Sequence, residues 1–436
     1  MSEISRAVKG TNDILPENSH DWQFVEGKML ETSRLYGFRE IRVPVFEHTE
    51  VFKRSVGDTT DVVQKEMYTF DDKGGRSLTL RPEFTAGVVR SCIENGLVNG
   101  ALPLKVCYVG GCYRYEKPQA GRLREFHQFG AECFGAKSPA ADAEMISLAK
   151  SILDGIGIEK ISLEINSIGC PECRKKYHIA LKTYFENYKS ELCDTCRDRL
   201  DRNPMRILDC KSPVCKKIAE NAPVVIDFLC EECRDHFEGV KRHLDAMNIK
   251  YTVNPHIVRG LDYYTKTVFE FVSGDIGAQA TVCGGGRYDG LVSQMGGPKL
   301  PALGFAMGIE RLMLCLKNQN TSLPDEKKCD LYIAPLGSAA ELKASELCKK
   351  LRRDGFEVQT DICGRGLKAQ MKYADKIGAL YSTVIGDDEI NAGNIKLKNM
   401  KSGDTVQIDI EELSEKLFAL KYSDALESLT DSVKNF

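Results

Sequence analysis

The sequence lacks any apolar run long enough to cross a membrane. Its first residues, MSEISRAVKGTNDILP, also lack the apolar segment of a secretion signal, so we expect a cytoplasmic protein with no membrane partner. There is no large excess of charge of one sign, because the formal net charge is −3. A nucleic-acid partner would therefore have to bind at local basic patches. The glycine-rich residues 284–289 lack the Lys-Ser/Thr pair of a P-loop.

Cysteine, by contrast, is abundant. The 436 residues, enough for two to four domains, include 17 cysteines, and a cytoplasmic protein rarely forms disulfides. Eight of them fall within a charged, helical segment: Cys170, Cys173, Cys193, Cys196, Cys210, Cys215, Cys230 and Cys233. Nineteen residues separate Cys173 from Cys193, a spacing typical of a zinc ribbon. Eight thiolates would suit two tetrahedral zinc sites. A helical insertion whose thiols carry no metal stays open as the alternative.

Residues 104–135 predict a long β-hairpin, because two strand-like runs flank a polar, basic loop at 117–123. Side chains alternate between the faces of a strand, so Arg114 and Glu116 are expected to share a face of the first strand. One face of the second strand would carry Phe126, Gln128, Gly130 and Glu132. A solvated sheet face could have this composition. It would leave Phe126 unexplained, and also Gly130, which makes room for a close approach to the backbone.

Two further segments predict polar residues near helix starts. A strand ends at Pro82-Glu83 and a helix follows from residue 84, so Glu83 would lie where an acid is favourable, at a helix N-terminus. Another strand, 302–307, precedes a helix whose apolar residues recur at helical spacing. Arg311 lies off that apolar stripe and near the helix start, where a cation is unfavourable unless an anion shares the site.

Beyond a polar linker at 318–328, strands alternate with helices, which predicts a separate unit with a mixed sheet. Positive charge is concentrated in this unit. The basic residues are Lys349, Lys350, Arg352, Arg353, Arg365, Lys368 and Lys372. Solvated helix faces often have this composition, so the charge alone does not establish a binding surface.

Several strings of residues resemble known motifs in the same order along the chain. The hairpin string R-Y-E…F-H-Q-F-G-A-E resembles motif 2 of class II aminoacyl-tRNA synthetases, and G-F-A-M-G-I-E-R-L, at 304–312, resembles motif 3. Residues 38–56, with Pro44, resemble motif 1, which forms a dimer interface. The most specific string, R-G-L-D-Y-Y-T at 259–265, resembles the motif of the histidyl-tRNA synthetase family and its close paralogues. The resemblance covers nearly the whole chain.

The resemblance implies an α+β fold, with the class II antiparallel sheet flanked by helices, a helical insertion and a C-terminal α/β anticodon-binding domain. We expect the catalytic domain at 1–169 and 246–320, the cysteine-rich insertion at 170–245 and the anticodon-binding domain at 327–425. A homodimer is also expected from motif 1.

The activity implied is that of a ligase. ATP, with Mg²⁺, would activate L-histidine to histidyl-adenylate and pyrophosphate, and the histidyl group would then pass to the 3′ end of tRNA(His). Two alternatives are a regulatory paralogue that binds histidine but charges nothing, and a nucleic-acid-binding protein without catalysis. Such paralogues lack the C-terminal domain and lose ATP-binding residues, whereas this chain keeps both.

The resemblance also implies individual roles. Arg259 and Arg114 would be catalytic, and both would stabilise the α-phosphate. The ATP-binding residues would be Arg114, Glu116, Arg122, Phe126 and Arg311. The histidine-binding residues would be Glu83, Thr85, Gln128, Glu132, Arg259, Tyr263, Tyr264 and Tyr288. Gln119, at the hairpin tip, would contact the acceptor end of the tRNA.

Overall fold

The computed structural model describes residues 6–56, 60, 62–208, 210, 212–257, 263–326 and 328–421. The chain divides into two compact units, Met1–Pro324 and Asp325–Phe436. The helices of the first unit are α1 (Pro16–Leu35), α2 (Thr49–Val56), α3 (Thr85–Glu94), α4 (Pro139–Gly155), α5 (Pro171–Glu186), α6 (Asp194–Arg202), α7 (Pro213–Ala219), α8 (Glu231–Ala246), α9 (Leu291–Gln294) and α10 (Ile309–Asn318). Within the described ranges, no helix combines the length and the apolar character needed to span a bilayer.

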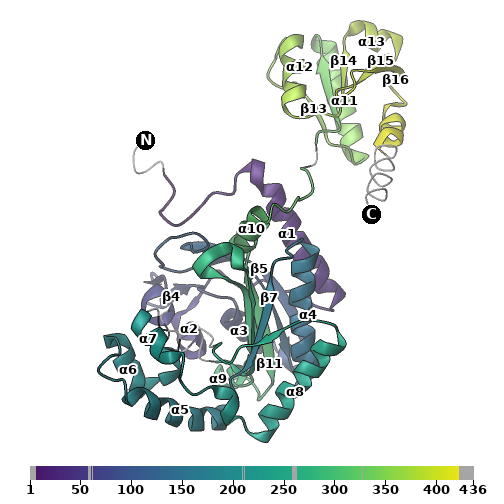
Figure 1. Cartoon of the computed structure of the whole chain (residues 1–436). Helices are drawn as coiled ribbons and strands as arrows, with labels where there is room; N and C mark the ends of the chain where they lie inside the picture. The colour runs from purple at the N-terminus through teal and green to yellow at the C-terminus, as the bar shows by residue number, and fades with distance from the viewer. Residues whose placement is uncertain are drawn as a thin grey trace. The chain divides into compact units, whose positions relative to one another are not determined.

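The first unit is built on a sheet of eight strands in the order β1-β5-β6-β11-β10-β9-β7-β8 (Figure 1). Its strands are β1 (Arg39–Glu40), β5 (Leu104–Tyr113), β6 (Glu125–Phe134), β7 (Ser162–Ser167), β8 (Thr252–Val253), β9 (Thr265–Val272), β10 (Thr281–Arg287) and β11 (Ala302–Gly308). The inner pairs are antiparallel and only the two edge pairs, β1 with β5 and β7 with β8, are parallel. The α+β prediction is therefore confirmed. A second, small sheet has the order β2-β4-β3, with β2 (Phe46–His48), β3 (Thr69–Asp71) and β4 (Ser77–Leu80).

The two faces of the large sheet are covered differently. One face packs on α1, α4, α8 and α10, whose apolar side chains bury Phe129 and Ala131 of β6. The other face packs on α3 and α9 and carries Tyr108 and Val268. Figure 1 shows α4 and α8 on one side of the strands and α3 and α9 on the other. The alternation expected for the second hairpin strand is thus observed, because Phe129 and Ala131 point away from the side occupied by Glu132.

The hairpin differs from expectation in its first strand. β5 ends at Tyr113, so the prediction that Arg114 and Glu116 share a strand face is wrong. The reason is a change of partner: the Tyr115 amide donates to the carbonyl of Glu66 at 2.7 Å instead of to the returning strand. Glu66 ends a π-helical turn, Val62–Glu66. Arg114 and Glu116 consequently lie on irregular backbone beside the sheet.

The glycine-rich residues 284–287 look like a phosphate-binding loop in the sequence but form a strand in the structure. They belong to β10, which pairs with β9 on one side and with β11 on the other. Its backbone is engaged in the sheet, so the segment is not a phosphate loop. Arg287, at the end of the strand, is fully buried and pairs with Asp142 of α4 and, at 3.2 Å, with Asp289.

Between β7 and β8 the chain forms the helical insertion, α5 to α8, which has an apolar core of its own. That core includes Tyr177, Leu181, Phe185, Leu200, Ile207 and Val225. The amphipathic helices bury these side chains at helical spacing and expose their charged residues.

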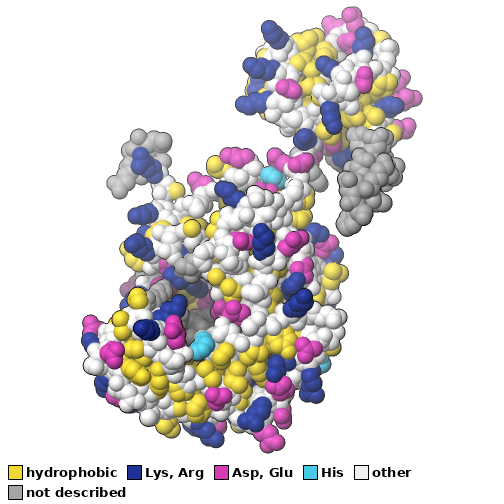
Figure 2. Space-filling model, viewed as in Figure 1, with side chains coloured by type: hydrophobic (Ala, Val, Ile, Leu, Met, Phe, Trp, Pro, Cys, Tyr) yellow, Lys and Arg dark blue, Asp and Glu magenta, His cyan; other side chains and the backbone are white. Residues whose placement is uncertain are grey.

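The second unit holds a five-stranded sheet in the order β13-β12-β14-β15-β16. Its elements are β12 (Leu331–Pro335), α11 (Ser338–Arg353), β13 (Val358–Thr360), α12 (Leu367–Lys376), β14 (Tyr381–Ile385), α13 (Asp387–Ala392), β15 (Asn394–Asn399) and β16 (Thr405–Asp409). β12 is parallel to both neighbours and the remaining pairs are antiparallel, so the expected mixed sheet is present. Figure 2 shows Lys and Arg side chains gathered over the part of this unit where α12 lies.

Candidate functional site

On the α3 side of the large sheet, the first unit contains a cavity of about 240 Å³. Most of the site residues expected from the sequence line it. They are Glu83, Thr85, Arg114, Glu116, Arg122, Phe126, Gln128, Glu132, Tyr263, Tyr264, Tyr288 and Arg311. Gln119 is not among the lining residues, and Arg259 lies outside the described residues. Segments far apart in the sequence thus meet in one cavity, which has two chemically different ends.

The first end, here called the carboxylate end, is centred on Glu132 in β6. This side chain is 1% exposed and accepts hydrogen bonds from the hydroxyls of Thr85 at 2.8 Å and Tyr108 at 2.9 Å, and also from the Tyr288 hydroxyl. Burial raises the pKa of Glu132 to about 8, although the hydroxyl donors oppose that shift. Glu132 is therefore a polar group shielded from water, and hydrogen-bond donors held in fixed positions are its preferred partners.

Tyr108 was not anticipated from the sequence. It pairs with Gly130 in the β5–β6 register, and a side chain at Gly130 would clash with the Tyr108 ring. A side chain at Gly304, which pairs with Glu132 across β6 and β11, would likewise clash with the carboxylate. The expectation that Gly130 leaves room for a close approach is therefore met, and the group that approaches is an aromatic ring of the protein itself. The signal that was missed is this pairing of glycines with large polar side chains on neighbouring strands.

Glu83 lies at the start of α3 and is 4% exposed. Its carboxylate accepts the backbone amides of Thr85 at 2.7 Å and Ala86 at 2.9 Å, so it satisfies amide groups that a helix start leaves unpaired. Burial raises its pKa, while these amides and the Arg114 charge oppose the rise. Glu83 thus stabilises the helix start and also contributes a carboxylate to the cavity wall.

The aromatic wall of the carboxylate end consists of three tyrosines. Tyr263 lies 4.7 Å from Tyr264 and 5.4 Å from Tyr288, measured between ring centroids. Burial raises the pKa of Tyr263 and of Tyr288 well above the ordinary value, so both hydroxyls remain protonated donors. Gln128, four residues before Glu132 in β6, accepts a hydrogen bond from the Cys112 thiol at 3.3 Å.

The second end, here called the arginine end, brings together Arg114, Arg122 and Arg311. The guanidinium of Arg114 donates to the Pro82 carbonyl at 2.8 Å and lies 5.1 Å from the centre of the Phe126 ring. Arg311 donates to the carbonyls of Gly121 at 3.0 Å and Thr281 at 2.7 Å. Burial lowers the pKa of Arg311, and the neighbouring charges of Arg122 and Arg114 lower it further.

Glu116 and Glu310 complete the arginine end. Glu116 pairs with Arg122 at 3.2 Å. Glu310, in the first turn of α10, accepts the backbone amide of His127 at 2.9 Å and its ring nitrogen Nδ1 at 2.9 Å. The hydrogen bond that His127 donates to the Glu310 carboxylate raises the pKa of His127. Through these bonds Glu310 connects the start of α10 to β6 and so fixes the position of Arg311. Glu310 was not singled out from the sequence, although it directly precedes Arg311.

Gln119 lies at the exposed tip of the hairpin. Its backbone exchanges hydrogen bonds with Arg122, at 3.0 and 2.9 Å, around Gly121, which has a φ of +70°. The turn directs Gln119 to the surface while Arg122 faces the cavity.

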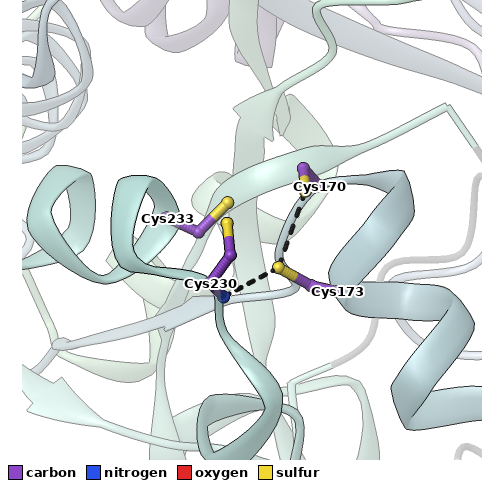
Figure 3. A group of neighbouring side chains, drawn as sticks. All are labelled: Cys170, Cys173, Cys230 and Cys233. Carbon is purple, nitrogen blue, oxygen red and sulfur yellow. Dashed lines mark hydrogen bonds between the residues drawn. The ribbon is translucent and has the colours of Figure 1, made fainter.

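The eight cysteines of the insertion form two groups. One contains Cys170, Cys173, Cys230 and Cys233 (Figure 3), and the other contains Cys193, Cys196, Cys210 and Cys215. The spacing in the sequence, ribbon-like between Cys173 and Cys193, left the pairing of the cysteines open. The structure places the first Cys-x-x-Cys pair beside the last, because α5 and α8 begin side by side at the base of the insertion.

Comparison with known proteins gives the following matches. Residues 10–172 and 215–312 match the family described as Histidyl-tRNA synthetase, and residues 330–420 match the family described as Anticodon binding domain. The histidine–tRNA ligase of Acetivibrio thermocellus is 54% identical over 95% of this chain and 99% of its own length. That of Caldanaerobacter subterraneus is 52% identical over 94% and 98%. The crystal structure of apo Staphylococcus aureus histidyl-tRNA synthetase covers 94% of this chain and 99% of its own, with 40% identity and a TM-score of 0.82.

Proposed function

Because this chain belongs to the histidyl-tRNA synthetase family, we infer that it is a histidine–tRNA ligase and charges tRNA(His) with L-histidine. ATP is the second substrate that such a ligase requires. The observation that supports this function best is the convergence of a buried carboxylate and several arginines in one cavity. An imidazole needs hydrogen-bonding partners of the first kind, and a triphosphate needs cations of the second kind.

At the carboxylate end we assign the amino acid. Glu132 and Tyr264 would bind the imidazole, with Tyr263 and Tyr288 enclosing it. A site built to bind a polar ring rejects apolar side chains, because its buried polar groups would then be left unpaired. The substrate's amino and carboxylate groups would contact the remaining polar residues of this end, which are Glu83, Thr85 and Gln128.

At the arginine end we assign ATP. Arg114 would bind the α-phosphate and Arg122 the departing pyrophosphate, because a guanidinium fork matches phosphate oxygens. Adenine would stack on Phe126, with Arg311 on its other face and Glu116 facing its amino group. Mg²⁺, an oxygen-seeking ion, would accompany the phosphates.

Arg259 is assigned a catalytic role by its place in the family string. As the histidine carboxylate attacks ATP, negative charge gathers at the α-phosphorus, and a cation fixed there stabilises the transition state. Arg259→His should slow adenylation by roughly 10²–10³-fold, the scale for losing such a donor. Transfer from preformed adenylate should change much less. Single-turnover rates for both steps measure this difference, and equal losses would remove Arg259 from the catalytic residues.

The C-terminal unit is assigned to the anticodon. It follows a polar linker, and several of its basic residues, Lys349, Arg353, Lys368 and Lys372, are exposed. A chain ending at Pro324 should still form adenylate but should charge tRNA poorly. Binding of tRNA by the full chain should weaken as salt rises, through release of counterions. If the shortened chain charges tRNA as well as the full chain does, this assignment is wrong.

The direct test of the activity is histidine-dependent exchange of pyrophosphate into ATP, followed by charging of tRNA(His). A regulatory paralogue would bind histidine without exchange, and a nucleic-acid-binding protein would bind tRNA without needing histidine. Either outcome would contradict the proposed ligase. The individual residue roles and Mg²⁺ stay predictions, as do the homodimer, the cytoplasmic location, the contact of Gln119 with the acceptor end, and zinc in the insertion.

A further inference from the structure

The two groups of four cysteines have the geometry of metal sites. We name Cys170, Cys173, Cys230 and Cys233 the neck cluster and Cys193, Cys196, Cys210 and Cys215 the tip cluster. In each cluster the four sulfur atoms all lie within 4.8 Å of one another. The Sγ–Sγ distance is 3.6 Å for Cys170 and Cys173, and 3.8 Å for Cys193 and Cys210.

These distances suit one ion in each cluster. Thiolates at about 2.3 Å from a tetrahedral zinc lie about 3.8 Å from one another. A disulfide would need about 2.05 Å. Four thiolates in tetrahedral arrangement favour zinc or a single iron over the oxygen-seeking cations.

Backbone amides also point at the sulfurs. The Cys230 amide donates to Cys173 Sγ at 3.1 Å, and the Cys193 amide donates to Cys215 Sγ at 3.3 Å. Cys170, Cys193 and Cys230 each directly precede a helix. Both arrangements stabilise thiolates, the form that binds a metal.

The neck cluster lies where the insertion joins the catalytic sheet. Cys170 comes three residues after the end of β7, and Cys230 and Cys233 belong to the start of α8. Figure 3 shows the cysteines of the two helix starts facing one another. The tip cluster, by contrast, belongs to the insertion's own core, where Cys196 and Cys215 pack with Leu200 and Ile207.

Two sets of hydrogen bonds connect the neck cluster to Tyr264, which lines the carboxylate end of the cavity, and to Lys266, two residues further along the chain. In the first, Arg174, which follows Cys173 directly, donates to the carbonyl of Tyr264 at 3.1 Å. In the second, Glu232, which precedes Cys233, accepts from the Lys266 ammonium at 2.8 Å. The Lys266 backbone is bonded in turn to the segment before Cys170, through the Ile168 amide at 2.8 Å and the Gly169 carbonyl at 2.9 Å.

We propose that each cluster binds one zinc ion, and that the neck ion positions Tyr264 and Lys266, and with them the histidine end of the cavity. The tip ion stabilises only the insertion. The coupling to histidine rests on the proposed ligase function, whereas the two metal sites do not. The neck cysteines act through Arg174 and Glu232 and are therefore positioning residues.

Metal content tests the sites first. The full chain, purified without chelator, should contain two zinc ions, measured by inductively coupled plasma mass spectrometry. Cys233→Ser, in the neck, and Cys196→Ser, in the tip, should each contain one. Cys363→Ser changes an exposed cysteine outside both clusters and should keep two. Fewer than two zinc ions in the unaltered chain, iron in their place, or unchanged zinc in either cluster variant would overturn the metal sites.

Kinetic constants then distinguish the roles of the neck cluster and the tip cluster. In histidine-dependent exchange, Cys233→Ser should raise the KM for histidine about tenfold or more and leave the KM for ATP nearly unchanged, since small displacements of positioning groups have effects of this size. Cys196→Ser should leave both values unchanged. Equal effects of the two variants on the KM for histidine would overturn the positioning role.

Arg174 provides a second test that leaves the cysteines intact, in case Cys233→Ser fails to fold. Arg174→Ala should keep two zinc ions and still raise the KM for histidine. The matched control is Lys175→Ala on the same helix, which removes only an exposed pair with Glu172. An unchanged KM in Arg174→Ala would contradict the coupling. A chain with two zinc ions but no exchange would instead contradict the ligase function and leave the metal sites standing.

Discussion

The two ends of the cavity are built on different kinds of backbone. The carboxylate end lies on regular strands, and Glu132 is 1% exposed and bonded to three hydroxyls. At the arginine end, Arg114 and Arg122 lie on the irregular hairpin tip, with side chains 22% and 29% exposed. The carboxylate end is thus preformed and buried, whereas the arginine end concentrates three positive charges that Glu116 balances only in part and that favour an anion.

This difference suggests that the two ends of the cavity have different functions. A preformed, buried end gives discrimination between amino acids, because a misfit leaves polar groups unpaired. A cationic end with access to water gives binding and rate, because phosphate groups arrive and depart there. Substitutions at the two ends should therefore affect different kinetic constants.

The largest effect is expected at the arginine end. Arg114→Ala should slow adenylation by about 10²–10³-fold, because one fixed donor to the reacting phosphate is lost. The KM for histidine should change little. Rapid-quench measurement of adenylate formation gives the rate. Arg124→Ala serves as control, since Arg124 belongs to the same hairpin but lies over the Tyr115 ring, at 4.3 Å. Similar losses in both variants would show that the hairpin as a whole, and not Arg114, is responsible.

A smaller effect is expected at the carboxylate end. Glu132→Gln keeps the shape of the side chain but replaces one acceptor oxygen with an amide donor facing hydroxyl groups. We expect kcat/KM for histidine to fall roughly 10- to 100-fold, because a buried polar group left without its partner costs about 1–3 kcal/mol. The KM for ATP should stay nearly constant. Glu125→Gln, on the same strand and bonded to Tyr113 at 3.3 Å, is the control. Parallel changes in both KM values would contradict the separation of the two ends.

The third effect concerns stability and pH. The pKa of Glu132 is raised from 4.5 to about 8, so the folded chain binds this proton more tightly than the unfolded chain does. The stability that follows is complete below pH 4.5 and is lost as pH rises through about 8. The Tm of the unaltered chain, relative to that of Glu132→Gln, should therefore fall between pH 5 and pH 8.5. Calorimetry at several pH values measures it, and a constant difference would mean that Glu132 keeps an ordinary pKa.

Local patterns predicted much of this molecule. The alternation of β6 placed Gln128 and Glu132 on the cavity side, and helical spacing placed Arg311 off the buried stripe of α10. Both predictions depend only on neighbours in the sequence. Tyr108 and Gly304 were missed because their importance depends on the register between neighbouring strands. Gly304, for example, lies opposite Glu132, although the two strands are far apart in the sequence.

The same reason explains one wrong prediction and one question that the sequence left open. Arg114 left the predicted strand because the next residue, Tyr115, bonds to Glu66, a partner some fifty residues earlier. The cysteines paired first with last because α5 and α8 meet at the sheet, whereas sequence spacing left their pairing open. In both cases a contact between distant segments decided the outcome. The family string, in turn, gave Arg259 a role that the described residues leave untested.

The neck cluster also bears on how such chains can diverge. Both ends of the insertion meet at one point beside the sheet, and α8 continues from there onto one face of the sheet. The cost of closing a longer loop rises slowly, by about 0.6 kcal/mol for each doubling of its length. The family match itself breaks off at residue 172 and resumes at 215, within this segment. Residues 173–214 are therefore the part of the insertion that can change most in sequence and length while the catalytic sheet keeps its register.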